Sequence, residues 1–163
     1  MKKTIILILC AIAGMSVNAQ KLGHIHSDTL LQIMPEYAAA QLNLEERSKQ
    51  YQAEITSQEQ QLQEKYTAYQ SLDPNTPAAI IQSREAELNQ MQQGLQEFAL
   101  FVQNELEKEQ NKLMKPIYDK AKAAIEKVSK DNGYTYIFDA STGILLFENG
   151  DDIMGLVKTE LGL

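Results

Sequence analysis

His24 and His26 are the two residues whose type and spacing suggest a specific chemistry. Residues 21–26 predict a short strand, and alternate residues of a strand share one face. Imidazole nitrogens bind zinc and other transition metals, and a symmetric oligomer would repeat the pair around its axis. No Cys, Asp or Glu is visibly coupled to the pair, so a polar strand face is the plainer interpretation. We predict no metal and no cofactor.

The rest of the sequence carries no catalytic pattern. It has no Gly-rich phosphate loop, no Cys/His ligand set and no nucleophile elbow. This argues against an enzyme.

The N-terminus predicts export. The single cysteine, Cys10, lies in an apolar run at residues 5–13, which follows Lys2 and Lys3 and precedes small residues ending at Ala19. This pattern is typical of a signal peptide cleaved after Ala19, and the run is too short to span a bilayer. Lipidation of Cys10 is disfavoured, because Leu9 occupies the position where a small residue is expected. We therefore predict residues 1–19 as a signal peptide, with no stable membrane insertion.

The exported chain would be acidic and free of thiols. Residues 20–163 contain 13 basic and 22 acidic side chains, a net charge of −9. Without cysteines its stability must come from packing or assembly. Phosphate binding requires Lys and Arg, so the acidic balance argues against a nucleic-acid partner.

The middle of the chain predicts a helical hairpin. Residues 36–130 contain one glycine, Gly94, and consist mostly of Gln, Glu, Lys, Ala and Leu, which favour helices. Pro74 and Pro77 interrupt them, and Thr76 can cap a helix that begins at Pro77. We predict an arm over residues 36–131, with its turn near 72–77.

Both predicted helices of the arm show heptad spacing of apolar residues, which predicts a coiled-coil seam between them. After Val102 the register shifts by four residues, a stutter that locally unwinds a supercoil. Pro116 lies in the same stretch and predicts a kink, so it is our hinge candidate. The predicted seam residues are Tyr37, Leu44, Tyr51, Ile55, Leu62 and Tyr69 in the first helix and Ile81, Leu88, Met91, Leu95, Phe98, Val102, Leu106, Leu113, Ile117, Ala121, Ala124 and Val128 in the second.

The two ends predict a small β-rich body, formed by residues 20–35 and 132–163. Residues 134–139 and 144–147 predict a β-hairpin through a turn at residues 141–143, and Asp152 can cap a last helix. A body of 48 residues buries little core alone, so we expect oligomerisation. The candidate contact residues are Ile25, Tyr136, Ile137, Phe138, Leu145 and Phe147.

This arrangement resembles the Skp/OmpH family of periplasmic chaperones, which hold unfolded outer-membrane proteins. The two ends carry most of the resemblance, through residues 133–140 and the helix that starts at Asp152 and Ile153. The resemblance implies an α+β fold in which a long antiparallel coiled-coil arm projects from the β body. It also implies a homotrimer that encloses its clients without ATP. The best-known members are basic and this chain is acidic, so no lipopolysaccharide site is carried over.

Two features are candidates for client contact. Phe101 and Leu100 fall outside the seam, as an apolar patch or as ordinary exposed side chains. Seven lysines against three acids make residues 108–130 locally basic, either as a belt that attracts acidic clients or as a solvated helix face. The lysine candidates are Lys108, Lys112, Lys115 and Lys122.

The sequence thus predicts an ATP-independent periplasmic holdase for unfolded outer-membrane β-barrel proteins. The alternative is a structural coiled-coil adaptor of the cell envelope with no affinity for unfolded chains.

Overall fold

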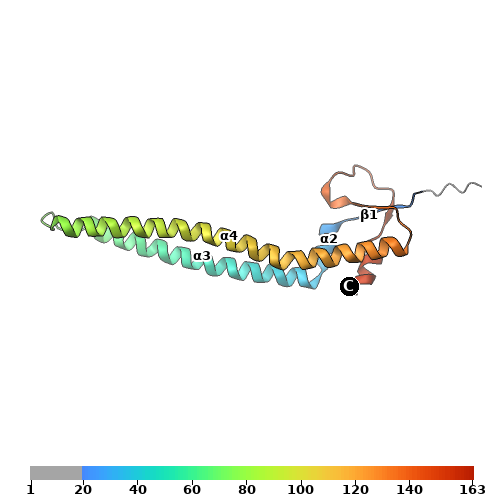
Figure 1. Ribbon diagram of the computed structural model, residues 1–163, viewed down its shortest axis with the longest axis horizontal. Helices are drawn as coiled ribbons and strands as arrows, with labels where there is room; N and C mark the ends of the chain where they lie inside the picture. The colour runs from blue at the N-terminus through green and yellow to red at the C-terminus, as the bar shows by residue number, and fades with distance from the viewer. Residues whose placement is uncertain (1–19) are drawn as a thin grey trace, which may run out of the picture. The chain divides into compact units, whose positions relative to one another are not determined.

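A computed structural model describes residues 20–163, and the predicted signal peptide at residues 1–19 lies outside them. The chain divides into two compact units (Figure 1). Among the described residues, unit 1 comprises residues 20–30 and Ala121–Leu163, and unit 2 comprises Leu31–Lys120. The sequence prediction placed these divisions at residues 35 and 131. The difference arises because Ala121, Ala124 and Val128 are buried in unit 1.

Unit 2 is built from two long helices that run antiparallel side by side (Figure 1). Helix α3 spans Pro35–Gln70, with proline at its first position, where a missing N–H costs nothing. Helix α4 spans Ala78–Asp131, and its residues up to Lys120 belong to this unit. Lys65 of α3 pairs with Glu87 of α4 at 2.6 Å, and Arg47 pairs with Glu109 at 3.6 Å, which fixes the antiparallel direction.

The turn between these helices is organised by Asp73. Its carboxylate accepts a hydrogen bond from the Asn75 backbone N–H at 2.7 Å, and its carbonyl accepts one from the Thr76 hydroxyl at 2.7 Å. The Thr76 hydroxyl is therefore engaged within the turn and does not cap α4. The helix begins at Ala78, one residue later than predicted.

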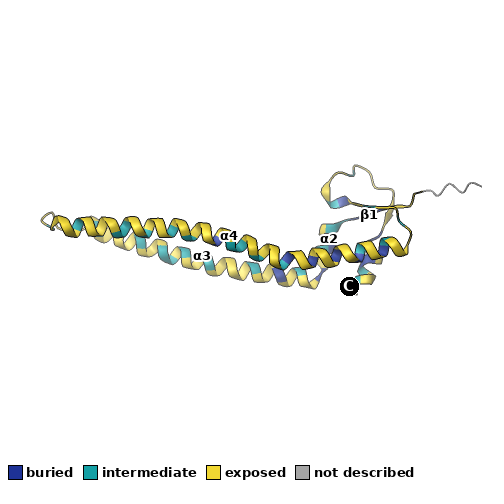
Figure 2. Cartoon of the chain, in the orientation of Figure 1, coloured by how far each residue is buried: buried dark blue, intermediate teal, exposed yellow. Residues whose placement is uncertain are grey.

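The predicted seam is confirmed by burial, because each of its residues is buried or half-buried (Figure 2). Between Ala40 and Val102, however, no side chain is fully buried. Two helices alone cannot enclose a core, so this part of unit 2 rests on half-exposed apolar contacts and polar pairs.

Unit 1 contains a three-stranded parallel sheet in the order β2-β1-β3. Strand β1 (Leu22–Ile25) lies in the centre, between β2 (Tyr136–Asp139) and β3 (Asp151–Asp152). Leu22 is opposite Tyr136, and His24 is opposite both Phe138 and Asp152. Parallel strands need long connections, and here the two helices of the hairpin separate β1 from β2 in sequence.

The predicted hairpin of residues 134–147 is wrong. Asp139 caps a 3₁₀ helix, η1 (Ala140–Thr142), by accepting a hydrogen bond from the Ser141 N–H at 3.0 Å. Gly143 then takes a left-handed conformation (φ 68°), and residues 144–147 form no strand. The third strand is instead Asp151–Asp152, a residue type that is depleted in strands and gave no sequence signal.

Helix α2 (Ser27–Ile33) follows β1 in the sequence, and helix α5 (Met154–Leu161) follows β3. The Asp152 carboxylate accepts a hydrogen bond from the Met154 N–H at 2.8 Å, at the start of α5. This is the capping contact that the sequence predicted for the last helix of the chain. The core of unit 1 is small (Figure 2). Its buried side chains are Ile25, Leu30, Ala121, Ala124, Val128, Ala140, Ile153 and Val157.

Candidate interaction surfaces

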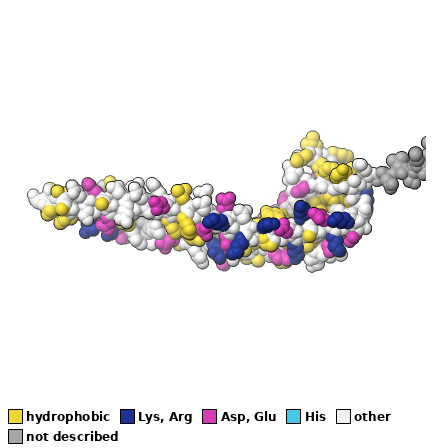
Figure 3. Space-filling model, in the orientation of Figure 1, with side chains coloured by type: hydrophobic (Ala, Val, Ile, Leu, Met, Phe, Trp, Pro, Cys, Tyr) yellow, Lys and Arg dark blue, Asp and Glu magenta, His cyan; other side chains and the backbone are white. Residues whose placement is uncertain are grey.

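Unit 1 exposes several large apolar side chains close to its sheet. Tyr136 and Phe138 alternate along β2, so they share a face, and their rings lie 6.4 Å apart. Ile144, Leu146 and Phe147, which we call the apolar strip, are 79%, 98% and 81% exposed. Figure 3 shows hydrophobic side chains gathered over this part of the unit. Exposed apolar side chains gathered in this way make the surface a candidate interaction site.

The other predicted contact residues differ in their availability. Ile25 is 2% exposed, so its side chain is already packed inside unit 1 and offers no surface to another copy. Ile137 and Leu145 are half-buried. A hollow of about 500 Å³ lies between β1 and residues 145–151, with Phe138, Leu145 and Phe147 among its lining residues.

A polar cluster ties the start of α2 to η1. The Asp139 carboxylate accepts hydrogen bonds from the Ser27 hydroxyl at 2.5 Å and from the Ser141 hydroxyl at 2.7 Å. Burial alone would raise the pKa of Asp139, but these hydrogen bonds outweigh it and hold the pKa below its ordinary value. The pKa of Asp28 is also lowered, first by its hydrogen bond with Ser141. Because these hydrogen bonds join the start of α2 to η1, we interpret the cluster as structural.

The two histidines converge on one carboxylate that the sequence did not reveal. The Nε2 atoms of His24 and His26 each lie 3.4 Å from an oxygen of Glu148. Glu148 is more than 120 residues away in the chain, and the sequence prediction placed it just after a hairpin strand at residues 144–147. Across residues 20–163, no group of three or more His, Cys, Asp or Glu side chains could hold a metal ion.

In unit 2 an aromatic group joins the two helices. Tyr51 of α3 meets Phe98 of α4 edge to face, with ring centroids 6.4 Å apart. Phe98 in turn stacks on Phe101 at 6.3 Å, with 24° between the ring planes. Phe98 is therefore a packing residue, while Phe101 and Leu100 remain 52% and 63% exposed. The heptad spacing identified Tyr51 and Phe98, but not the stacking of Phe101 on the seam.

The lysines of residues 108–130 are all paired with acids. Lys108 lies 2.8 Å from Glu105, Lys115 lies 2.7 Å from Asp119, and Lys120 pairs with Glu36 of α3. The hydrogen bond to Glu105 raises the pKa of Lys108 above its ordinary value. The remaining four lysines form five pairs, which are Lys112 with Glu109, Lys122 with Glu126, Lys127 with Asp131 and Glu160, and Lys130 with Glu126. Positive and negative groups consequently alternate along the surface (Figure 3).

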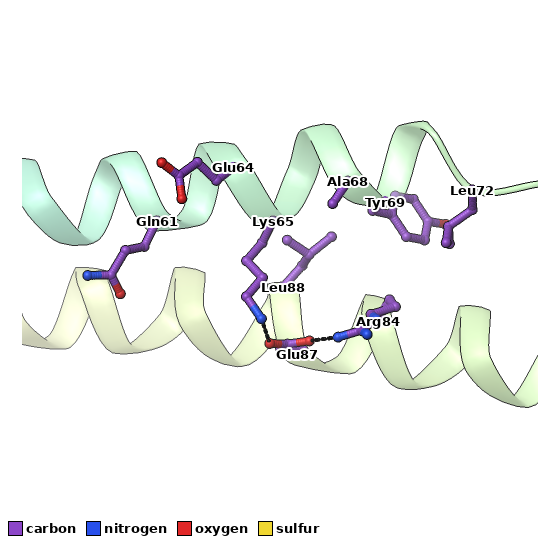
Figure 4. A pocket seen from close by; sticks show the side chains of 9 residues that line it. All are labelled: Gln61, Glu64, Lys65, Ala68, Tyr69, Leu72, Arg84, Glu87 and Leu88. Carbon is purple, nitrogen blue, oxygen red and sulfur yellow. Dashed lines mark hydrogen bonds and ion pairs between the residues drawn. The ribbon is translucent and has the colours of Figure 1, made fainter.

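A groove of about 460 Å³ lies near the turn of the arm (Figure 4). Glu87 holds both Lys65 at 2.6 Å and Arg84 at 2.9 Å beside the apolar side chain of Leu88. These two cations lower the pKa of Glu87, Lys65 first. Every charge drawn there except Glu64 is thus engaged in an ion pair, and the groove shows no acid and base arranged for catalysis.

Pro116, the hinge candidate, lies inside α4, which continues through it without a break. Proline has no N–H, so the carbonyl four residues before it lacks its intrahelical partner. Met114 and Ile117 on either side are buried, and the division between the two units falls shortly afterwards, at Lys120.

These surfaces define a class of protein. Residues 20–163 combine a long helical hairpin, a small parallel sheet and exposed apolar groups, which is the architecture of a protein that acts through contact with other chains. Among these residues, no helix is both long enough and apolar enough to cross a membrane.

The comparison with known families makes the assignment specific. The sequence model of the family described as "Outer membrane protein (OmpH-like)" matches residues 21–161. The chain therefore belongs to the OmpH-like, or Skp/OmpH, family. This is a family of periplasmic chaperones without enzymatic activity, so the protein is a chaperone of this kind and not an enzyme.

A solved structure shows the same fold. It is a candidate OmpH-like outer membrane chaperone from Caulobacter crescentus CB15, with a TM-score of 0.74 and 17% sequence identity. The match covers 88% of this chain and 84% of the other. Among curated proteins, none matches this sequence.

Proposed function

We propose that the protein is an ATP-independent periplasmic holdase that binds unfolded outer-membrane β-barrel proteins and prevents their aggregation. The observation that carries the proposal is the half-exposed apolar surface along unit 2, on a chain that belongs to a chaperone family. A holdase must accept dissimilar sequences and release them without fuel. Shallow apolar surface suits this task better than one deep pocket does.

Client holding depends on the aromatic surface around Phe101 and Leu100. Phe101 is anchored on Phe98, which is half-buried in the seam, so its ring presents a fixed exposed face without loss of packing. An unfolded outer-membrane strand carries aromatic and aliphatic side chains that can stack on such a ring.

The lysines have a smaller part in this proposal than their number indicates. Lys108, Lys112, Lys115 and Lys122 each have an acidic neighbour within 4.0 Å, which cancels much of their field at a distance. They steer acidic clients weakly, and mainly at low salt.

Assembly as a homotrimer completes the proposal. Unit 1 buries few side chains, while Tyr136, Phe138 and the apolar strip are exposed in the single chain. Contact between copies through these groups would remove them from water and enlarge the core. Export through a signal peptide at residues 1–19 places the trimer in the periplasm, where its clients pass.

The experiment is an aggregation assay that separates a holdase from an envelope adaptor. A urea-unfolded outer-membrane porin is diluted into buffer with residues 20–163, without nucleotide, and light scattering is followed. A holdase suppresses scattering in proportion to its concentration. Scattering equal to that with a non-binding control protein would contradict the proposal and favour the adaptor.

A further inference from the structure

Residues 143–150 connect η1 to β3 and carry the apolar strip. In the described structure, residues 144–149 make no hydrogen bond with the rest of the chain. Ile144, Leu146 and Phe147 are largely exposed, so apolar packing also holds this segment weakly. The position of the segment therefore depends on the ion-pair contacts of its one charged side chain, Glu148.

These contacts join Glu148 to His24 of β1 and to His26, which directly follows the strand. His24 and His26 approach the same carboxylate oxygen, each at 3.4 Å, and their rings are edge to face with centroids 6.4 Å apart. The His24 side chain is 13% exposed and that of Glu148 is 29% exposed, so solvent screens this pair less than it screens a fully exposed ion pair. The His26 side chain is 44% exposed, so its pair with Glu148 is screened more.

The other charged groups nearby are already engaged. Lys21 and Asp151 line the same hollow but lie 3.8 Å from each other, and Asp151 also accepts a hydrogen bond from Tyr134. Asp152 is opposite His24 in register, and its carboxylate accepts from the Met154 N–H. The pKa of Asp28 is lowered mainly by its hydrogen bonds with Ser141 and Thr29, and His26 adds only the smallest contribution. Glu148 is thus the acid that both imidazoles share.

Histidine is the side chain that ordinarily changes charge between pH 5 and 8. When both rings are protonated, each attracts the Glu148 carboxylate. When both are neutral, what remains is a long 3.4 Å contact that contributes little. The attachment of the segment therefore strengthens as pH falls through this range and weakens as pH rises.

We propose that His24, His26 and Glu148 form a protonation-dependent clasp that fixes residues 143–150, and with them the apolar strip, to β1. The clasp adjusts how firmly the strip is presented. It does not depend on clients, so its test stands whatever the aggregation assay shows.

The mobility of a spin label at Leu146, measured by electron paramagnetic resonance on residues 20–163, tests the clasp, because the Leu146 side chain is 98% exposed and its replacement disturbs no packing. The labelled wild type is compared with labelled Glu148→Gln at about pH 5.5 and about pH 8. Glu107→Gln, in unit 2, is the matched control. We expect the ratio of the mobile to the immobile spectral component to be about fivefold higher in Glu148→Gln than in the wild type at the lower pH, from the loss of two ion pairs, and the same in both proteins at the higher pH.

Two results would overturn the proposal. One is a difference between Glu148→Gln and the wild type that is equal at both pH values, because Glu148 would then act without the imidazolium charge. The other is faster hydrogen exchange of the hydrogen-bonded amides of β1 and α5 in Glu148→Gln, because Glu148 would then support the whole unit. The double variant His24→Gln/His26→Gln should lose the pH dependence, whereas Glu107→Gln should keep it as in the wild type.

Discussion

Among the glycines of the described residues, Gly23 has the least room for a side chain. A Cβ atom built there would lie 2.9 Å from Ile137 Cδ1, 3.0 Å from the Asp151 carbonyl oxygen and 3.1 Å from Tyr134 Cε1. Because one of these neighbours is backbone on β3, the sheet itself would have to move. Close approach of three strands at this point explains why β1 carries a glycine in its centre.

Gly23→Ala should therefore lower the free energy of unfolding by about 1–3 kcal/mol through overpacking. Urea denaturation followed by circular dichroism measures the change. Gly155→Ala in α5 is the control, because a Cβ there meets nothing within 4 Å, and it should leave stability equal or slightly higher. Equal midpoints for the wild type and Gly23→Ala would show that the strands are spaced more widely than described.

Asp139 links stability to pH. Its pKa is lowered in the folded chain, so its contribution is present above the ordinary aspartate pKa, about 3.9, and is lost as pH falls through the folded value. Asp139→Asn should reduce stability at neutral pH by about 1–3 kcal/mol, because the Ser27 and Ser141 donors lose a charged acceptor.

Thermal unfolding between neutral pH and about pH 2 checks this expectation. Asp139→Asn should lose less stability than the wild type on acidification, while Asp131→Asn, at the exposed end of α4, should follow the wild type. If the wild type and Asp139→Asn fall in parallel, the carboxylate is not the linked group.

Phe101→Ala should quicken the release of bound client severalfold, because it removes an exposed aromatic ring from the contact surface. The protein should stay folded, because Phe98, on which the ring stacks, remains in the seam. Tyr118→Ala is the matched control, since Tyr118 is 51% exposed on the same helix. Stopped-flow release of a fluorescent porin measures both rates. Equal release by Phe101→Ala and the wild type would remove Phe101 from the contact surface.

The elements show what a sequence of this kind can and cannot predict. The helices follow from heptad spacing, since each of Tyr51, Leu88 and Phe98 lies where the seam requires it. The third strand could not be predicted, because Asp151 and Asp152 are poor strand residues that pair with β1 only through tertiary contacts. Residues 144–147 have strand composition, yet η1 turns the chain away before them. Glu148 reaches the histidines only through that unpredicted path.

Pro116 is the residue of α4 at which we predict hinge motion. Replacing it by Ala restores an intrahelical hydrogen bond, so stability should rise by up to about 3 kcal/mol and α4 should stiffen. Spin labels at Gln92 and Asp131, which flank Pro116 on α4, report the breadth of the distance distribution. Pro116→Ala should narrow it, and Lys115→Ala should not. An unchanged breadth in Pro116→Ala would mean that the proline is not a hinge.

For the whole molecule, the two units differ in what holds them together. Unit 2 between Ala40 and Val102 has no fully buried side chain, which permits bending and adaptation to clients. Unit 1 has a few fully buried residues beside a large exposed apolar surface, so burial between copies would make stability rise with the logarithm of protein concentration. The sequence indicated this need through the size of the body, although it misplaced the strands that form it.

The mass of residues 20–163 in solution, free and mixed with an unfolded outer-membrane porin, tests the central claim most directly. Light scattering coupled to size exclusion, at micromolar concentration and without nucleotide, gives both values. The proposal predicts three times the chain mass for the free protein and one discrete complex that contains the porin. A stable folded monomer, or a trimer that leaves the porin to aggregate, would contradict it.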